Sequence, residues 1–192
     1  ESFIRQGLLP AAAIQETEAA IDLLVYYAGW CDKYIQVFSS VNPVESSHFN
    51  FSYHEPMGVL TVIAPEESGL LGMVAAIAPM IIGGNAITVL ASEKYPMTAI
   101  DFAEVLHASD VPGGVVNIIT GYRKEFLSHA ASHMDVNGIV YSDLTAEQRK
   151  LVQTNAAGNV KRVVDFSKEE MATPYRILSG QEVKTTWHPI GS

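Results

Sequence analysis

Hydrophobic and polar residues follow two different periods along this chain, and the period changes near Gly58. Before that point, apolar residues recur at steps of three and four from Ala11 to about Val37, after Pro10. This spacing predicts one long amphipathic helix. Its predicted apolar stripe consists of Ile14, Ile21, Leu24, Val25, Ala28, Cys31 and Ile35.

From Gly58 onward, short β-branched runs alternate with helical patterns. The predicted strands are Gly58–Ile63, Ala86–Leu90, Val115–Thr120, Gly138–Tyr141 and Val160–Phe166, and the helices between them are Leu70–Ile82, Met97–Ala108, Lys124–Ser132 and Thr145–Ala157. Thr145 and Gln148 have the spacing of a capping box at the start of the last helix. Nearly continuous apolar strands separated by helices predict a doubly wound parallel sheet of about five strands with both faces covered, an α/β fold.

Two further runs alternate with the period of a strand but lie outside this array. They are Phe49–Tyr53 and Glu182–Trp187, and a polar connection from Ser167 to Pro174 precedes the second. A lone strand must pair with another, so the two runs predict a small β-flap. The sequence thus divides into a Rossmann-like domain at 1–168, with one flap strand near 49–53, and a linker with a C-terminal flap arm at 169–192.

Composition limits the classes of protein and partner. The 192 residues are 48% hydrophobic and 17% charged, which is typical of a globular domain. Twelve basic against 21 acidic residues leave a net charge of −9, which disfavours nucleic acid and anionic membranes as partners. The apolar stretch Leu70–Ile82 is shorter than the ~20 residues of a membrane span. A single cysteine predicts a reducing compartment, hence the cytoplasm, and a first residue Glu1 predicts a piece of a longer protein.

Several segments occur in an order and spacing that resemble the nucleotide-binding half of the aldehyde dehydrogenase superfamily. The segments are Tyr26–Tyr34, His54–Val59, Gly84-Asn85, Ser92–Ala99 and Pro112–Gly121, and the resemblance covers roughly Ala20 to Val164. The residues Gln181–Trp187 resemble the C-terminal oligomerisation arm of that family. The chain therefore looks like the superfamily without its catalytic domain. It is most similar to the non-catalytic C-terminal domain of the aldehyde dehydrogenase 16 family or of long bifunctional proline-utilisation enzymes.

The resemblance implies a cysteine nucleophile, a glutamate base and an asparagine oxyanion donor, and this chain departs from each. Cys31 lies on the helical stripe, where its spacing predicts a buried and inert residue. Glu66 and Glu67 stand where the family has tryptophan and asparagine. They are either a paired-carboxylate acid–base site or two solvated acids at a helix N-terminus. Phe166 falls on the glutamate position. We therefore expect no catalytic residue in this chain.

The family binds NAD, and its ribose-binding lysine corresponds here to Leu90, while Asp143 replaces a glycine near the pyrophosphate. The added charge and side chain oppose a phosphate there. These departures predict no cofactor for this chain, with Pro65, Ser92 and Glu93 as vestiges of the cofactor site. His129 and His133 have the spacing of a two-histidine zinc site, but Ala130 replaces the glutamate of such motifs, so no metal is expected.

Two functions are consistent with this sequence. In the first, the chain is a catalytically silent domain for assembly of a larger aldehyde dehydrogenase. Its flap would pack on a catalytic domain of the same or a partner chain, or on a second copy in a homo-oligomer. In the second, it is the NAD-binding piece of an active NAD-dependent aldehyde dehydrogenase whose catalytic domain lies outside this sequence.

Overall fold

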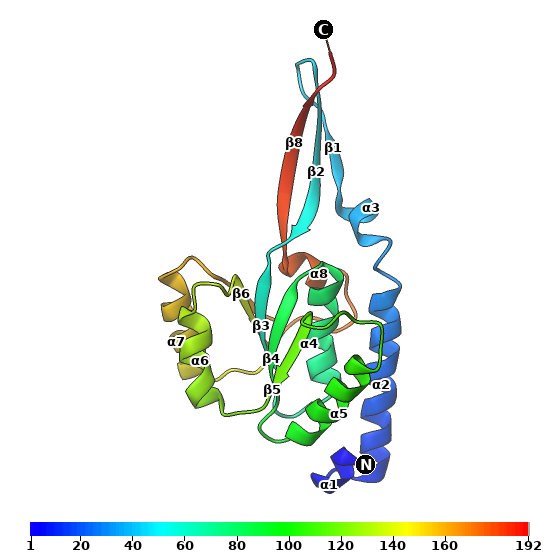
Figure 1. Cartoon of the computed structure of the whole chain (residues 1–192), viewed down its shortest axis with the longest axis vertical. Helices are drawn as coiled ribbons and strands as arrows, with labels where there is room; N and C mark the ends of the chain where they lie inside the picture. Colours follow the sequence, from blue (N-terminus) through cyan, green and yellow to red (C-terminus); the bar gives the residue numbers. More distant parts are fainter. Residues whose placement is uncertain (192) are drawn as a thin grey trace.

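The computed structural model describes residues 1–191 and contains a five-stranded parallel sheet (Figure 1). Its strands are β3 (Val59–Ile63), β4 (Ala86–Leu90), β5 (Val116–Ile119), β6 (Gly138–Tyr141) and β7 (Arg162–Asp165), in the order β5-β4-β3-β6-β7. Every neighbouring pair is parallel. The predicted doubly wound α/β fold is confirmed.

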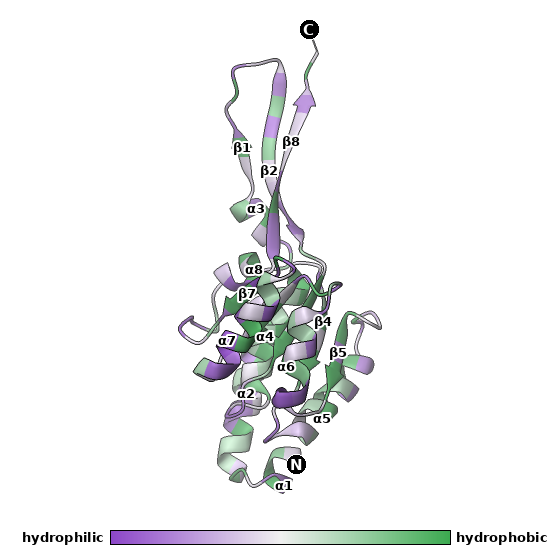
Figure 2. Ribbon diagram, turned by 90° about the vertical axis from the view of Figure 1, so that its left-hand side faces the viewer, coloured by the Kyte–Doolittle hydropathy of each residue, from purple (hydrophilic) through white to green (hydrophobic). Residues whose placement is uncertain are grey.

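Helices cover both faces of this sheet. One face carries α4 (Leu71–Ile82) and α5 (Pro96–His107), with α2 (Pro10–Ala28) packed outside α4, and the other carries α6 (Arg123–Ser132) and α7 (Ala146–Ala157) (Figure 1). Figure 2 shows the hydrophobic colour on the parallel strands and α4, whereas α7 is mostly hydrophilic. The sandwiched helix α4 is buried from Gly72 to Met80, and each large side chain there contributes roughly 1.5–3 kcal/mol through burial.

A proline inside α4 leaves one backbone carbonyl without its helical hydrogen bond, and a distant arginine donates to that carbonyl instead. Pro79 has no N–H, so the carbonyl of Ala75 loses its partner four residues on. Arg176 donates from Nη1 to this carbonyl at 3.1 Å and from Nη2 to Phe166 O and Glu169 O at 3.3 and 2.8 Å. Its guanidinium also lies 4.2 Å from the centre of the Phe166 ring. Arg176 therefore joins α4 to the segment that follows β7.

The first long helix differs from its prediction in length and in the face that it buries. Helix α2 ends at Ala28, a turn follows, and a separate helix α3 spans Tyr34–Phe38. The predicted stripe residues Ile14, Ile21 and Val25 are each more than half exposed. The buried face consists of Ala13, Ala20, Leu23 and Tyr27. Small alanines on this face allow the backbones of α2 and α4 to approach closely, which a stripe chosen by residue size does not detect.

The predicted flap is a three-stranded antiparallel sheet that extends from the body of the molecule (Figure 1). Strand β2 (His48–Pro56) pairs with β8 (Gln181–Pro189) along its length, from His48 opposite Pro189 to Pro56 opposite Gln181. The pairing of the two flap runs is thus confirmed. A short strand β1 (Ser40–Asn42), which the sequence analysis missed, pairs with the other edge of β2. Two short helices were also missed, α1 (Ser2–Arg5) and α8 (Tyr175–Ser179).

Asn85 fastens the base of the flap to the sheet. Its buried Nδ2 donates to Met80 O at 2.9 Å and to Gly180 O at 3.0 Å, and its Oδ1 accepts from Gly58 N at 3.1 Å. Gly58 has a φ of +123°, a conformation that favours glycine. The two strands that leave the body, β2 and β8, are therefore held at one point. Among the described residues, no helix has the length and apolarity needed to cross a membrane.

Candidate functional site

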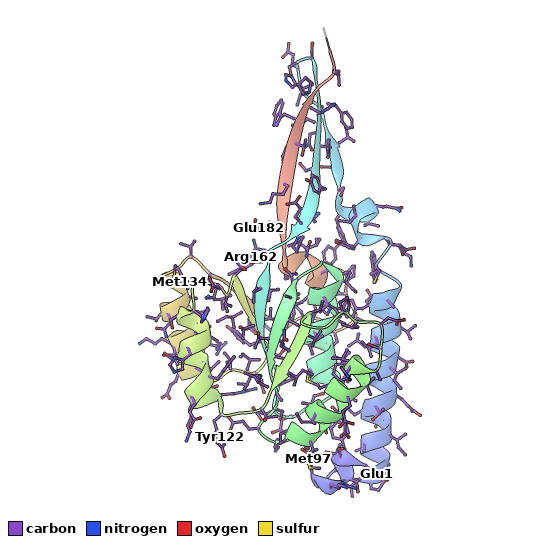
Figure 3. All side chains as sticks on the ribbon, in the orientation of Figure 1. Glu1, Met97, Tyr122, Met134, Arg162 and Glu182 are labelled. Carbon is purple, nitrogen blue, oxygen red and sulfur yellow. The ribbon has the colours of Figure 1, made fainter. Side chains whose placement is uncertain are left out.

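The order of the strands reverses between β3 and β6, which makes their carboxyl ends a topological switch point. The chain proceeds outward from β3 to β4 and β5 and then returns to β6 and β7. Loops at such a switch point diverge to opposite faces of the sheet and leave room for a ligand. Tyr122, Met97 and Glu1 lie at this end of the molecule, and Met134, Arg162 and Glu182 lie near the other end of the sheet (Figure 3).

A buried arginine lies between two carboxylates at this switch point. Arg123, the first residue of α6, has a side chain only 7% exposed. Its Nε is 2.9 Å from Glu66 Oε1, and its Nη2 donates to Asp143 Oδ1 at 2.7 Å and to Ala64 O at 2.6 Å. We call Arg123, Glu66 and Asp143 the Arg123 cluster. A buried guanidinium requires such pairing, because an unpaired charge in the interior is strongly destabilising.

The Arg123 cluster bridges the two loops that flank the switch point. Asp143, two residues after β6, accepts the backbone N–H of Glu66 on Oδ2 at 2.7 Å. Glu66, three residues after β3, also accepts from Ser92 Oγ at 3.0 Å and from Lys94 N at 3.2 Å on Oε2. The ends of β3, β4 and β6 are thereby connected through polar contacts to the start of α6.

The three predicted cofactor-site residues lie together at the carboxyl ends of the parallel strands, which we call the carboxyl edge. Ser92 is 2% exposed, and its Oγ donates to Glu66. Glu93 Oε1 accepts from Arg123 N at 2.7 Å. Pro65 packs against Gly72, where an added Cβ would lie 2.2 Å from the proline ring. Their assignment to a cofactor remains a prediction.

The two acids Glu66 and Glu67 have different environments. Glu67 is exposed and pairs with Lys94 Nζ at 2.6 Å, as expected for a solvated acid. Glu66 is not solvated in this way, because it belongs to the Arg123 cluster. The acid at the N-terminus of α4 is instead Glu16 of α2, whose Oε1 accepts from Leu70 N at 2.9 Å and Leu71 N at 3.1 Å. A carboxylate from another helix therefore caps α4.

The sequence analysis missed Arg123, although one signal was available. A cation in the first turn of a helix is unfavourable with respect to the helix dipole, so an arginine at that position needs an acidic partner. Asp143 was treated as a charge opposing phosphate, and the structure shows that this charge is paired with Arg123.

Cys31 is exposed, so its prediction as a buried core residue is wrong. The cause is the early end of α2, which leaves Cys31 in the turn before α3 rather than on a helical face. This turn lies towards the flap, at the opposite end of the molecule from Tyr122 and the carboxyl edge (Figures 1 and 3).

Two of the remaining candidates make structural contacts. Phe166 is buried beneath Arg176. His133 accepts the Asp135 N–H on Nδ1 at 3.2 Å, a local turn contact. Within residues 1–191, no group of three or more His, Cys, Asp or Glu side chains has a metal-binding arrangement.

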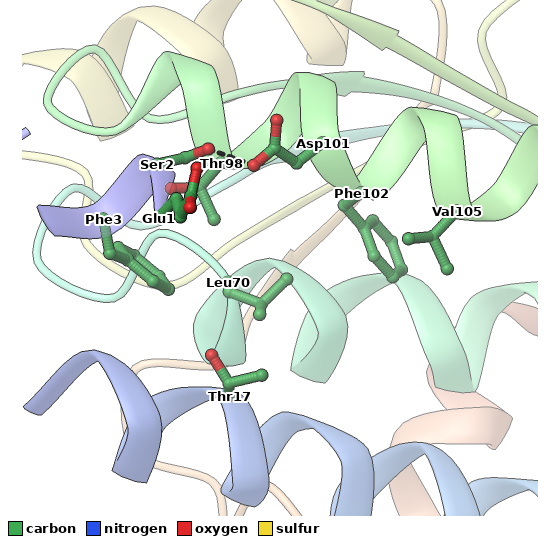
Figure 4. Close-up of a pocket in the computed structure, with 9 residues that line it drawn as sticks. All are labelled: Glu1, Ser2, Phe3, Thr17, Leu70, Thr98, Asp101, Phe102 and Val105. Atoms are coloured by element: carbon green, nitrogen blue, oxygen red, sulfur yellow. Dashed lines mark hydrogen bonds between the residues drawn. The ribbon is translucent and has the colours of Figure 1, made fainter. Parts of the chain in front are cut away.

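A separate cavity of about 200 Å³ lies among α1, α2 and α5 (Figure 4). Phe3, Leu70 and Phe102 form its apolar walls, and Ser2 Oγ hydrogen-bonds Asp101 at one side. This volume is below the roughly 300–1,000 Å³ of ordinary ligand sites. The cavity is therefore too small to hold a dinucleotide.

The parallel sheet, its reversal and the polar carboxyl edge define a Rossmann-like nucleotide-binding fold. The model of the aldehyde dehydrogenase family matches residues 3–165, and the chain belongs to this family. Omega-crystallin of Enteroctopus dofleini is 33% identical over 151 residues, which cover 79% of this chain and 30% of the relative. Retinal dehydrogenase 2 of Mus musculus is 36% identical over 150 residues, covering 77% and 28%. The chain thus spans about 30% of the length of such relatives.

Solved structures agree with this assignment. PnpE from Pseudomonas sp. WBC-3 matches with a TM-score of 0.71 at 28% identity, covering 78% of this chain and 30% of that one. A Y450L point mutant of betaine aldehyde dehydrogenase from Staphylococcus aureus, in complex with NAD+, matches with a TM-score of 0.72 at 26% identity and the same coverage. PnpE in complex with nicotinamide adenine dinucleotide matches with a TM-score of 0.71.

These complexes overturn the expectation that this chain has no cofactor. That expectation treated Leu90 and Asp143 as sufficient to abolish the site, one through a lost ribose donor and the other through unpaired charge. In the structure, Asp143 is neutralised by Arg123, and the fold is the one that holds NAD in the two similar proteins.

Proposed function

We propose that this chain is the NAD-binding and assembly part of an aldehyde dehydrogenase and does not oxidise aldehydes by itself. The observation that carries the proposal is the separation of Cys31 from the carboxyl edge. Thiolate attack on an aldehyde requires the thiol, an oxyanion donor and the cofactor at one place. The sole thiol of this chain lies towards the flap instead.

The groups at the carboxyl edge support the same proposal. An ionised carboxylate cannot donate a hydrogen bond to an oxyanion, and Glu66 is held as a carboxylate partner of Arg123. The phenyl ring of Phe166 can neither accept nor release a proton. Any turnover by the whole protein would therefore need catalytic groups from another part of it or from a partner.

The assembly role is supported by the surface of the flap. Phe49, Phe51 and Tyr53 form an aromatic row on one face of β2, with successive ring centres 5.4 and 5.8 Å apart. Val183 and Trp187 are 61% and 58% exposed on the opposite face. Within residues 1–191, β8 pairs with β2 alone, so its outer edge offers unpaired backbone groups.

We propose that the arm at 169–192, with β2, packs on a catalytic aldehyde dehydrogenase domain or on a second copy of this chain. The resemblance to the non-catalytic domain of the aldehyde dehydrogenase 16 family supports a role of this kind. The alternative is that the chain is the NAD-binding piece of an active dehydrogenase, and the family match supports both.

One experiment tests the proposal directly. The 192-residue chain is titrated with NAD by calorimetry and then assayed for cofactor reduction with several aldehydes. We expect binding of NAD and no reduction of it. Turnover that disappears in Cys31→Ala would contradict the absence of catalysis, and failure to bind NAD at millimolar concentration would contradict the cofactor assignment.

A further inference from the structure

One face of the parallel sheet is only partly covered by helices. Val116 and Ile118 of β5 pack towards α4, so Asn117 and Ile119 point to the opposite face, where both are exposed. Figure 2 shows α6 and α7 over this face, with β5 beside them. An open pocket of about 320 Å³ lies here between α6 and the strands β3 and β4. We call it the α6 pocket, and its volume is within the roughly 300–1,000 Å³ of ordinary ligand sites.

The walls of the α6 pocket are apolar. Val59 at the start of β3, Phe126 of α6 and Val136 ahead of β6 line it, together with Ala130 of α6. Val59 is 37% exposed, although it begins the central strand of the sheet. An apolar ligand would remove this surface from water, which is the main favourable contribution to binding in pockets of this kind.

Two threonine hydroxyls interrupt this apolar surface. The side chain of Thr61 points to the α6 side, because its neighbours Leu60 and Val62 pack towards α4, and Thr61 is 1% exposed. Thr88 lies opposite Thr61 in the register of β3 and β4 and also lines the pocket. Within residues 1–191, no other residue hydrogen-bonds either hydroxyl, whereas Asn117, next in the same row, donates to two backbone carbonyls. Since buried polar groups are nearly always hydrogen-bonded, the two hydroxyls offer unused donors and acceptors to a ligand.

The charges around the α6 pocket favour an uncharged ligand. The acid that lines it, Asp135, is exposed and repels an anion, as does the net charge of −9. His133 accepts the Asp135 N–H on Nδ1, which places the ring proton on Nε2 and makes His133 a neutral donor rather than a cation. His129 is exposed to solvent, where a charge is screened. A charged group against the two threonines would lose its hydration with no opposite charge to pair with.

We propose that the α6 pocket binds a small, uncharged and largely apolar molecule that carries one hydroxyl or carbonyl oxygen, such as an aromatic alcohol. The oxygen hydrogen-bonds Thr61 and Thr88, and the hydrocarbon part packs on Phe126 and Val59. This site goes beyond the proposed function. Because Val59 begins β3, the pocket lies towards the amino-terminal ends of the strands, away from the carboxyl edge. Binding here requires neither NAD nor the flap.

Titration of the 192-residue chain with three probes that share one ring tests the preference for an uncharged ligand. The probes are benzyl alcohol, benzoate and benzylamine at pH 7, and the readout is the NMR signals of the methyl groups that line the pocket, in Val59, Thr61, Thr88, Ala130 and Val136. We expect saturable shifts of these signals with benzyl alcohol, and affinities at least about fivefold weaker for the two charged probes. Equal affinities for the three probes, or shifts confined to other methyl groups, would overturn the proposal.

Three variants and a control show whether the pocket and its hydroxyls are responsible. Thr61→Val and Thr88→Val keep the branched shape and remove one hydroxyl each, so each should weaken benzyl alcohol binding by about fivefold. Ala130→Leu fills the pocket and should abolish the shifts; if it does not fold, Thr88→Phe fills the pocket from a half-buried strand position instead. Thr120→Val is the matched control, because Thr120 is exposed after β5 and does not line the pocket. Undiminished binding by a folded pocket-filling variant, or equal losses in Thr61→Val and Thr120→Val, would contradict the assignment.

A second copy of the chain is the other occupant that an open sheet face allows. Dilution of the protein without any probe distinguishes the two, because self-association would shift the same methyl signals with protein concentration. Such concentration-dependent shifts, together with no effect of benzyl alcohol, would overturn the proposal. Signals that are independent of concentration, respond to benzyl alcohol and lose this response in the filled variant support it. Neither result bears on the binding of NAD, which is measured separately.

Discussion

Replacing Arg176 by methionine should destabilise the fold by about 2 kcal/mol, because its side chain supplies the donor that the Ala75 carbonyl lacks inside α4. The Phe166 carbonyl would keep the Glu169 N–H at 3.2 Å, whereas the Ala75 carbonyl would lose its buried donor. The unsatisfied Ala75 acceptor costs about 1 kcal/mol or more, and loss of the contact with the Phe166 ring adds roughly another 1 kcal/mol. Methionine fills most of the volume, so the effect reports the polar contacts rather than a cavity.

Combining Pro79→Ala with Arg176→Met tests whether Arg176 compensates for the proline. Alanine restores an N–H at position 79, which can donate to the Ala75 carbonyl through an ordinary helical bond. In the Arg176→Met background, this change should recover about 1 kcal/mol more than it contributes in the wild-type chain. Urea unfolding followed by circular dichroism measures all four free energies of unfolding. A loss below about 1 kcal/mol for Arg176→Met, or strict additivity of the two changes, would refute the link between Pro79 and Arg176.

Three other predictions concern pH, the flap base and assembly. Burial raises the pKa of Tyr27 from 10.0 to about 12, so stability is fully present below pH 10 and falls as the pH rises through 12. The loss approaches roughly 3 kcal/mol, and Tyr27→Phe should flatten this part of a pH series of urea unfolding curves. Asn85→Ala should cost about 2 kcal/mol, because Met80 O and Gly58 N lose the Asn85 side chain while Gly180 O keeps Met57 N and Gln181 Nε2. Hydrogen exchange at Gly58 should accelerate, and an unchanged Gly58 rate would contradict this. A chain ending at Glu182 keeps the buried Gln181 and should stay folded but lose self-association or binding to a catalytic partner in sedimentation, and unchanged assembly would exclude β8 as the interface.

The sheet could be predicted from sequence because the pattern of apolar residues in its strands is typical of buried β-strands and of little else. Runs such as Val59–Ile63 are β-branched, apolar and bounded by turn residues, so both their type and their order are visible. The antiparallel pairing of the flap was also predictable, since a lone strand requires a partner. The capping box of Thr145 and Gln148 forms as predicted.

What failed depended on contacts between distant residues. The buried face of α2 could not be chosen, because Ala13 and Ala20 signal close packing only when the partner helix is known. Cys31 was misplaced for the same reason, since the end of α2 was hidden within a longer apolar pattern. Arg123 acquires its meaning from Glu66 and Asp143, which lie 57 residues before it and 20 residues after it in the printed sequence. The local pattern of apolar and polar residues cannot reveal contacts between residues so far apart in the sequence.

Strand β2 of the flap continues almost directly into β3 of the parallel sheet. Only Met57 and Gly58 separate the two strands. Asn85 hydrogen-bonds Gly58 and Gly180 at that point. After Gly58, β3 lies at the centre of the parallel sheet and ends three residues before Glu66. One stretch of backbone therefore links the flap, through Gly58 and β3, to the loop whose Glu66 N–H donates to Asp143.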